Sequence, residues 1–111
     1  MLSMDLPRTV LVQQVKDLFD SKANLCLIDV RQDWEFELCH IEGSLHLPLD
    51  QLPQRLTEIP ENTPLFTLCH HGIRSGHAAA FLKNAGFKDV SNIKGGIDAW
   101  AKQINPTLKT Y

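Results

Sequence analysis

Apolar residues occur along the chain in two patterns, short continuous runs and longer stretches with helical spacing. They recur at helical spacing from Val12 to Phe19, which predicts an amphipathic helix. The next segment, Leu25 to Ile28, is continuously apolar and ends in Asp29-Val30-Arg31. Such a run is typical of a parallel strand that is buried on both faces and whose carboxyl end reaches polar surroundings.

The same two patterns continue through the rest of the chain. They predict a short helix over 32–38, a second apolar segment over 45–47 and a short helix over 49–59 opening near Asp50. They also predict strands over 65–68 and 90–93, a helix that starts at Ser75 and ends before Gly86 as its C′ residue, and a helix over 97–103. Strands that alternate with helices predict an α/β fold with a mostly parallel sheet covered on both faces. Such sheets bind ligands outside the carboxyl ends of their strands.

Length and charge exclude several kinds of partner. A chain of 111 residues is long enough for one domain. Its net charge of −2 provides no basic surface, so we expect no nucleic-acid partner. The N-terminal segment contains Asp5 and Pro7 and no long apolar run, which predicts neither a secretory signal nor a membrane span. We therefore expect a cytoplasmic protein that makes no membrane contact.

The chain has three cysteines, Cys26, Cys39 and Cys69, and none of them forms a C-x-x-C pair. An odd number without that pair argues against a disulfide framework and against a thioredoxin-type redox site. Cys26 lies inside the first apolar run and is interpreted as a small hydrophobic residue. Cys69 differs, because it ends a predicted strand and is followed by a polar loop and a helix.

The position of Cys69 predicts a reactive thiol. A side chain between a strand end and a helix start faces the unpaired amide groups of the first helical turn, which carry partial positive charge. Gly72 allows the loop to turn several amides inward, and the Arg74 guanidinium adds a full positive charge. These features favour the thiolate and activate Cys69 as a nucleophile.

A metal site is the first alternative, because Cys39-His40 and Cys69-His70-His71 offer potential ligands. Zinc sites usually space the two ligands of a pair by about two to four residues, whereas these residues are adjacent. The spacing therefore argues against a metal at this loop, and we expect none.

Four segments, LIDVR, CHIEGSLHLPL, CHHGIRS and NIKGGIDAW, occur in an order that resembles the single-domain rhodaneses, which are sulfurtransferases. The resemblance implies a five-stranded parallel sheet with helices on both faces. It also implies that residues 1–111 form a single domain with a core of about 10–101 and flexible ends at 1–8 and 104–111.

The resemblance also implies roles for individual residues. Cys69 would alternate between thiolate and persulfide, and Asp29 and Arg31 would order its loop. The anion-binding loop would comprise His70, His71, Gly72, Ile73, Arg74 and Ser75. The implied reaction moves sulfur from thiosulfate or a similar donor to cyanide or a thiol without a cofactor. A sulfur-accepting protein is a further candidate partner.

Two other functions remain open for this fold. Related cysteine phosphatases and arsenate reductases resemble H-C-x5-R, whereas this chain has Leu68 before Cys69 and the shorter interval C-x4-R. A tighter ring of amides suits one sulfur atom better than a tetrahedral phosphate or arsenate. A non-catalytic binding module usually lacks the loop cysteine. One departure from the rhodanese pattern is Cys39, where a glycine is usual, and it leaves the local turn geometry open.

Overall fold

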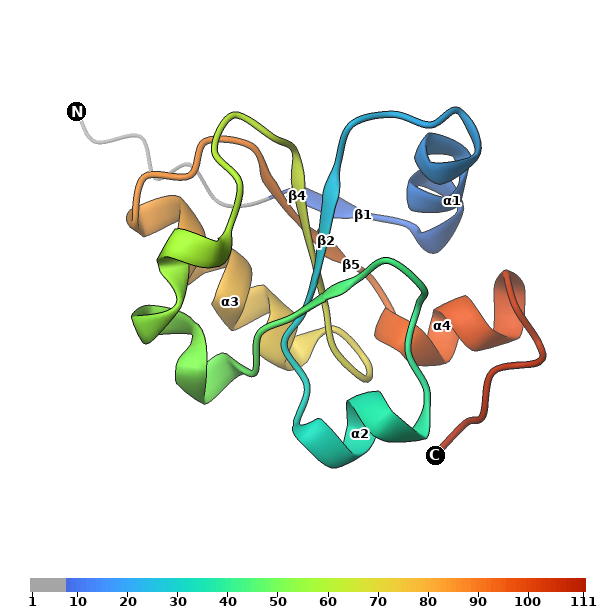
Figure 1. The fold of residues 1–111 in the computed structure, drawn as a ribbon. Helices are drawn as coiled ribbons and strands as arrows, with labels where there is room; N and C mark the ends of the chain where they lie inside the picture. The colour runs from blue at the N-terminus through green and yellow to red at the C-terminus, as the bar shows by residue number, and fades with distance from the viewer. Residues whose placement is uncertain (1–7) are drawn as a thin grey trace.

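The computed structural model describes residues 8–111, which form a five-stranded, all-parallel sheet with helices on both faces (Figure 1). The strands are β1 (Arg8–Val10), β2 (Cys26–Asp29), β3 (Leu45–His46), β4 (Leu65–Leu68) and β5 (Val90–Ile93). They lie in the order β1-β5-β4-β2-β3, and each neighbouring pair runs parallel. The predicted fold class is therefore confirmed. The flexible end predicted for residues 1–8 lies, apart from Arg8, outside the described residues.

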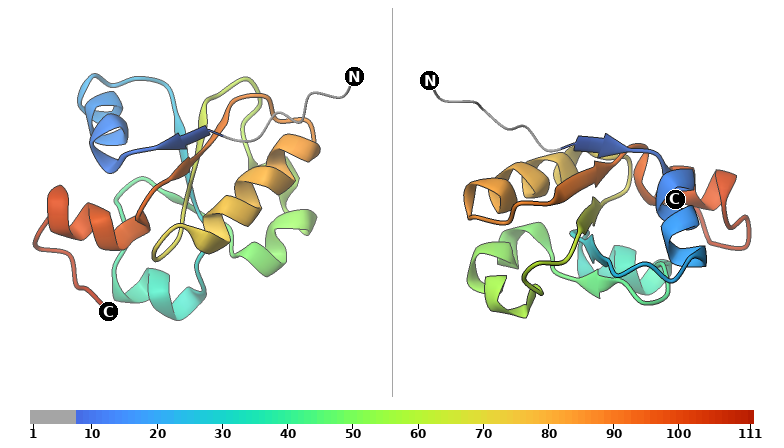
Figure 2. Two further views of the ribbon diagram at one scale, coloured as in Figure 1. Left: turned by 180° about the vertical axis from the view of Figure 1, so that it is seen from behind. Right: turned by 90° about the horizontal axis from the view of Figure 1, so that it is seen from above.

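The helices divide between the two faces of the sheet. They are α1 (Val12–Asp20), α2 (Asp33–Leu38), α3 (Ile73–Asn84) and α4 (Gly96–Gln103), with two short 3-10 helices, η1 (Leu49–Gln54) and η2 (Leu56–Glu58). Figure 2 shows α1 and α4 on one face and α3 with the 3-10 helices on the other. None of the helices described in residues 8–111 is long and apolar enough to cross a membrane.

The segment from Leu49 to Ile59 differs from its prediction. The sequence predicts one short helix opening near Asp50, whereas the structure has the two 3-10 helices η1 and η2. Pro53 lies inside η1 and has no N–H, so it cannot donate to the carbonyl four residues earlier as an α-helix requires. The chain uses tighter turns here instead.

Strand β1 was missed by the hydrophobic pattern. Only Val10 of its three residues is apolar, and the strand lies at the edge of the sheet, where it pairs with β5 alone. A three-residue edge strand with exposed side chains leaves no run of apolar residues in the sequence. The pattern therefore locates four strands, and the fifth is the exposed one.

The core has two halves, one on each side of the sheet. Leu27 and Phe66 point toward α1 and α4, while Ile28 and Leu65 point toward α3, because successive strand residues face opposite sides. Both faces are buried, which explains why the central strands are continuously apolar in the sequence.

The parallel arrangement gathers the polar strand ends at one edge. Asp29 of β2 pairs in register with Leu68 of β4, so Cys69 emerges beside the Asp29-Val30-Arg31 segment. The segment 104–111, predicted as a flexible end, runs from α4 and ends beside α2 near this edge (Figure 1). Its Tyr111 is hydrogen-bonded to Glu35 of α2.

Candidate active site

Cys69 is the first residue after β4, and its side chain is almost fully buried, with 1% of its surface exposed. Its Sγ receives a hydrogen bond from the Gly72 amide at 3.0 Å. Gly72 caps α3 with φ of +114°, in the left-handed region that favours glycine. This conformation folds the chain back after three residues and aims an amide at the sulfur.

Helix α3 begins at Ile73, two residues earlier than predicted. Ile73 and Arg74 therefore belong to its first turn. Thr67 of β4 anchors this turn, because its hydroxyl donates to the Ser75 carbonyl at 2.8 Å. The Cys69 sulfur thus lies at the positive end of a twelve-residue helix, which favours negative charge on it.

The Ser75 hydroxyl lies between two acceptors. Its Oγ is 3.2 Å from Cys69 Sγ and 2.6 Å from Asn92 Oδ1. The side-chain amide of Asn92 donates to the Gly72 carbonyl at 3.0 Å, which fixes the Asn92 side-chain oxygen toward Ser75. A hydroxyl has one proton, so Ser75 can donate to Asn92 while the thiol is protonated and to the sulfur once it is ionised. Ser75 and Asn92 can thus accompany Cys69 both as a thiol and as a thiolate.

The amino end of α4 holds the other side of the loop. The Ile97 amide donates to the Cys69 carbonyl at 2.8 Å, and the Asp98 amide donates to the His70 carbonyl at 3.1 Å. Gly96 lies so close that an added Cβ would clash with the carbonyl oxygens of Cys69 and His70. With these carbonyls bound to α4, the loop is held where the Gly72 amide meets the sulfur.

Asp29 and Arg31 form an ion pair with both side chains fully buried, and Arg31 Nη2 lies 2.6 Å from Asp29 Oδ2. Arg31 also donates to the carbonyls of Glu35 and Cys39. Burial alone would lower the pKa of Arg31, but the hydrogen bond and charge of Asp29 raise it above its usual value. Arg31 therefore stays charged and holds the carboxyl-terminal end of α2.

The structure answers the question that Cys39 raised. Its backbone is extended, with φ of −162° and ψ of 146°. Any residue adopts this conformation, so the turn before Gly43 does not require glycine at position 39. Its thiol is buried 3.9 Å from Arg31 Nη1.

Arg74 is bound to a carboxylate that the sequence analysis did not single out. Its two terminal nitrogens donate to Glu35 at 2.6 and 2.9 Å, and the Tyr111 hydroxyl donates to the same carboxylate at 2.6 Å. Burial would raise the pKa of Glu35, but these hydrogen bonds outweigh it and lower the pKa to about 2. The positive charge of Arg74, which the sequence predicts beside the Cys69 sulfur, is therefore paired with the Glu35 carboxylate.

The remaining predicted loop residues face in different directions. Ile73 is 74% exposed, and the exposed His71 side chain lies 3.9 Å from Asp98. His70 is half-buried, and its ring stacks on Tyr111. Burial and the charge of His71 lower the pKa of His70. Within residues 8–111, no three His, Cys, Asp or Glu side chains are grouped so that they could hold a metal ion.

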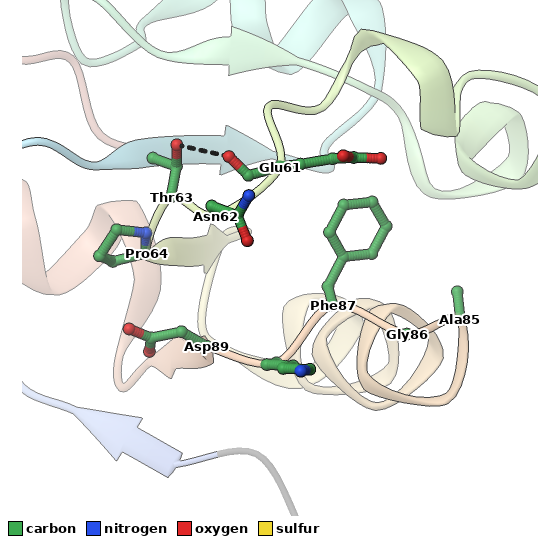
Figure 3. A pocket seen from close by; sticks show the side chains of 9 residues that line it. Glu61, Asn62, Thr63, Pro64, Ala85, Gly86, Phe87 and Asp89 are labelled. Atoms are coloured by element: carbon green, nitrogen blue, oxygen red, sulfur yellow. Dashed lines mark hydrogen bonds between the residues drawn. The ribbon is translucent and has the colours of Figure 1, made fainter.

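A pocket of about 550 Å³ lies at the other end of the sheet (Figure 3). It lies where β4 and β5 begin, and Phe87 points toward Glu61 across it. Cys69 follows the opposite, carboxyl end of β4. The Cys69 thiol is therefore separated from this pocket by the length of the strand.

The residues that the sequence analysis missed left signals of unequal strength. Asn92 is a polar residue in a short apolar strand, and Glu35 follows shortly after the Asp29-Val30-Arg31 segment. Either signal could have marked a polar contact near the strand ends. Tyr111 has no such signal, because only the fold brings it to Glu35, 76 residues earlier.

Comparisons with known proteins agree with this geometry. A family model described as a rhodanese-like domain matches residues 11–103. The thiosulfate sulfurtransferase GlpE of Tolumonas auensis is 34% identical over 78% of this chain and 81% of its own length. The probable adenylyltransferase/sulfurtransferase MoeZ of Mycobacterium tuberculosis is 37% identical over 93% of this chain, which spans only 27% of that relative.

A solved structure shows the same fold. The reduced Bacillus anthracis CoADR-RHD is 30% identical and superimposes with a TM-score of 0.82. The match covers 96% of this chain and 18% of that one.

The buried ion pair gives a stability prediction. We expect Arg31→Leu to lower the free energy of unfolding by about 3–5 kcal/mol, because it leaves Asp29 buried without a partner. In the matched control, Arg8→Leu removes the exposed pair with Asp89 and should cost less than about 1 kcal/mol. Urea unfolding measures both. Equal losses of unfolding free energy in Arg31→Leu and Arg8→Leu would contradict the role given to the buried Asp29–Arg31 pair.

The contact between Gly96 and the loop gives a second prediction. Gly96→Ala should lower the free energy of unfolding by at least about 3 kcal/mol, because the new Cβ would meet the carbonyls of Cys69 and His70. Gly43 has a similarly positive φ with nothing within 4 Å, so Gly43→Ala should cost only about 1 kcal/mol of backbone strain. Urea unfolding of the two variants tests this, and a smaller loss for Gly96→Ala would refute it.

The lowered pKa of Glu35 predicts a pH dependence of stability. The carboxylate stabilises the fold fully above the ordinary pKa of 4.5, and this contribution is lost as the pH falls through about 2. Glu35→Gln should therefore cost about 1–3 kcal/mol at neutral pH. The difference from the parent should shrink below pH 4.5. Chemical unfolding across pH measures it, with Glu37→Gln, an exposed acid on the same helix, expected to match the parent.

Proposed function

Because the chain belongs to the rhodanese-like domain family, we propose that it is a sulfurtransferase that works through a persulfide on Cys69. The proposed reaction moves a sulfane sulfur from thiosulfate or a similar donor to cyanide or a thiol. The observation that carries the proposal is the pair of donors at the Cys69 sulfur, the Gly72 amide at 3.0 Å and the Ser75 hydroxyl at 3.2 Å.

The proposed mechanism has two displacement steps. In the first, the Cys69 thiolate attacks the outer sulfur of thiosulfate, a new S–S bond forms, and sulfite leaves with the electrons of the broken S–S bond. In the second, cyanide or a thiolate attacks the outer persulfide sulfur, and Cys69 departs as a thiolate. The first step takes one sulfur from the donor and the second delivers it, so neither needs an external oxidant or reductant.

The loop would serve both steps in the same way. Negative charge stays on sulfur at the amino end of α3 throughout the cycle, so fixed donors there need little rearrangement. The Gly72 amide is held because Asn92 binds its carbonyl, and the Cys69 carbonyl is held by α4. Electrostatic preorganisation, rather than proton transfer, is the proposed source of catalysis.

The position of Arg74 favours sulfur transfer over phosphate or arsenate chemistry. An arginine that binds a tetrahedral anion presents two N–H groups to its oxygens. In this chain the two terminal nitrogens of Arg74 donate to Glu35 instead. Together with the short C-x4-R interval, this supports a site for a single sulfur atom.

The physiological partners of the site are proposed only by chemical class. A small sulfane donor and a thiol or cyanide acceptor suit a buried sulfur that sits within a short loop. A sulfur-accepting protein is a further proposed partner, and its thiol would have to reach the same loop. The proposed site uses the side chains and amides of this chain alone, with no cofactor.

Intact mass spectrometry after incubation with thiosulfate tests the proposal. We expect the parent to gain the mass of one sulfur atom and to lose it when cyanide is added. Cys69→Ser should gain none, whereas Cys26→Ser, which removes a half-buried thiol from β2, should gain as much as the parent. A parent that gains no sulfur but hydrolyses an aryl phosphate would refute the proposal.

A further inference from the structure

Residues 104–111 lie beyond the segment that the family model matches, and one of them, Tyr111, contacts the candidate site. Ile104 and Leu108 are half-buried against the core cluster that contains Trp100. Asn105 stabilises a turn, because its carbonyl accepts from the Leu108 amide and its side chain accepts from Thr107. The segment is thus anchored at Leu108 and held again at Tyr111.

The Tyr111 hydroxyl joins two ion pairs of the site. It donates to Glu35 Oε2 at 2.6 Å and accepts from Arg31 Nη1 at 3.0 Å. Glu35 is the partner of Arg74, and Arg31 is the partner of Asp29. Burial and the bond to Glu35 raise the pKa of Tyr111 to about 12, so the phenol keeps its proton at neutral pH.

The Tyr111 ring covers one flank of the Cys69 loop. It stacks on His70 with ring centres 3.9 Å apart and planes 8° from parallel. Its ring also meets Trp34 of α2 edge-on, at 5.5 Å. His70 directly follows Cys69, and its buried Nε2 has no hydrogen-bond partner among residues 8–111. The stack with Tyr111 is thus a principal contact of this imidazole.

We propose that Tyr111 is a specificity-determining residue that selects reactants of Cys69 by size. Its ring lies against the His70 side of the loop, while the rest of the segment packs beside Trp100. Small reactants reach the thiol with this segment in place, whereas bulky thiols reach it only after Tyr111 has moved away. That these reactants exchange sulfur with Cys69 rests on the proposed sulfurtransferase function, whereas the contact of Tyr111 with the loop does not.

The contacts of Tyr111 suit a cover that can open. The phenol and the ring are bound by side chains, while the neighbouring residues Lys109 and Thr110 are exposed. Opening therefore exchanges the stack on His70, the edge contact with Trp34 and two hydrogen bonds for hydration, and leaves the anchor at Leu108 in place. Such local opening is far less costly than unfolding the sheet.

Alkylation of Cys69 by two maleimides of different size tests the cover without any sulfur transfer. The reagents are N-ethylmaleimide and a maleimide that carries a polyethylene glycol chain, and peptide mass spectrometry separates Cys69 from Cys26 and Cys39. The variants are Tyr111→Ala, Tyr111→Phe, which keeps the ring and loses the hydroxyl, and Lys109→Ala, an exposed control on the same segment.

Tyr111→Ala should raise the rate with the bulky maleimide about tenfold, because the closed population loses its contacts, and should change the N-ethylmaleimide rate less than about threefold. Tyr111→Phe should lie between Tyr111→Ala and the parent, and Lys109→Ala should match the parent. The inference is overturned if the ratio of the two rates in Tyr111→Ala equals that of the parent, or if Lys109→Ala changes it equally.

Circular dichroism establishes that each variant is folded. Should Tyr111→Ala fail to fold, the same rate ratio in Tyr111→Phe decides, with an expected rise of about threefold and an unchanged ratio as the contrary result. Transfer from the persulfide to cyanide and to glutathione gives a second readout, in which Tyr111→Ala should accelerate only glutathione. A parent that forms no persulfide would refute the proposed function, while the alkylation ratio would still decide the role of Tyr111.

Discussion

The buried pairing of Asp29 with Arg31 is the interaction on which the architecture around Cys69 depends. Two charges removed from water are tolerated only when each is fully paired, and Arg31 meets this demand by binding Asp29 and the carbonyls of Glu35 and Cys39. Those contacts place α2 against the end of β2. The position of α2 then brings the Glu35 carboxylate to Arg74, on a helix that begins at the Cys69 loop.

The loop itself is positioned from three directions. Strand β4 delivers Cys69, the amino end of α3 supplies a donor at Gly72, and the amino end of α4 binds the carbonyls of Cys69 and His70. Two helix ends thus meet at one short segment, and each satisfies backbone groups that would otherwise be unpaired. This arrangement explains why a thiol with 1% of its surface exposed can still sit among polar groups.

Local patterns predicted the buried elements and the position of Cys69 well, because continuous apolar strands and a glycine before a helix leave clear signals. The edge strand β1 left none, since Arg8 and Thr9 are exposed. Pro53 made 49–59 two 3-10 helices rather than one helix.

The contacts of the site residues were harder still to predict from the sequence. Which charge Arg74 would meet depends on how α2 packs against α3, and no spacing along the chain encodes the arrival of Tyr111 at Glu35.

The order of the strands also sets when the domain can assemble. Strand β1 pairs only with β5, so the first strand of the sheet has no neighbour until Ile93 has been synthesised. The amides of Ile97 and Asp98, which bind the carbonyls of Cys69 and His70, come later still. A chain emerging from the ribosome therefore carries Cys69 before it carries the groups that hold its loop. The sheet and the Cys69 loop therefore reach their final form together, only after the start of α4 has been made, as expected for a fold dominated by contacts distant in sequence.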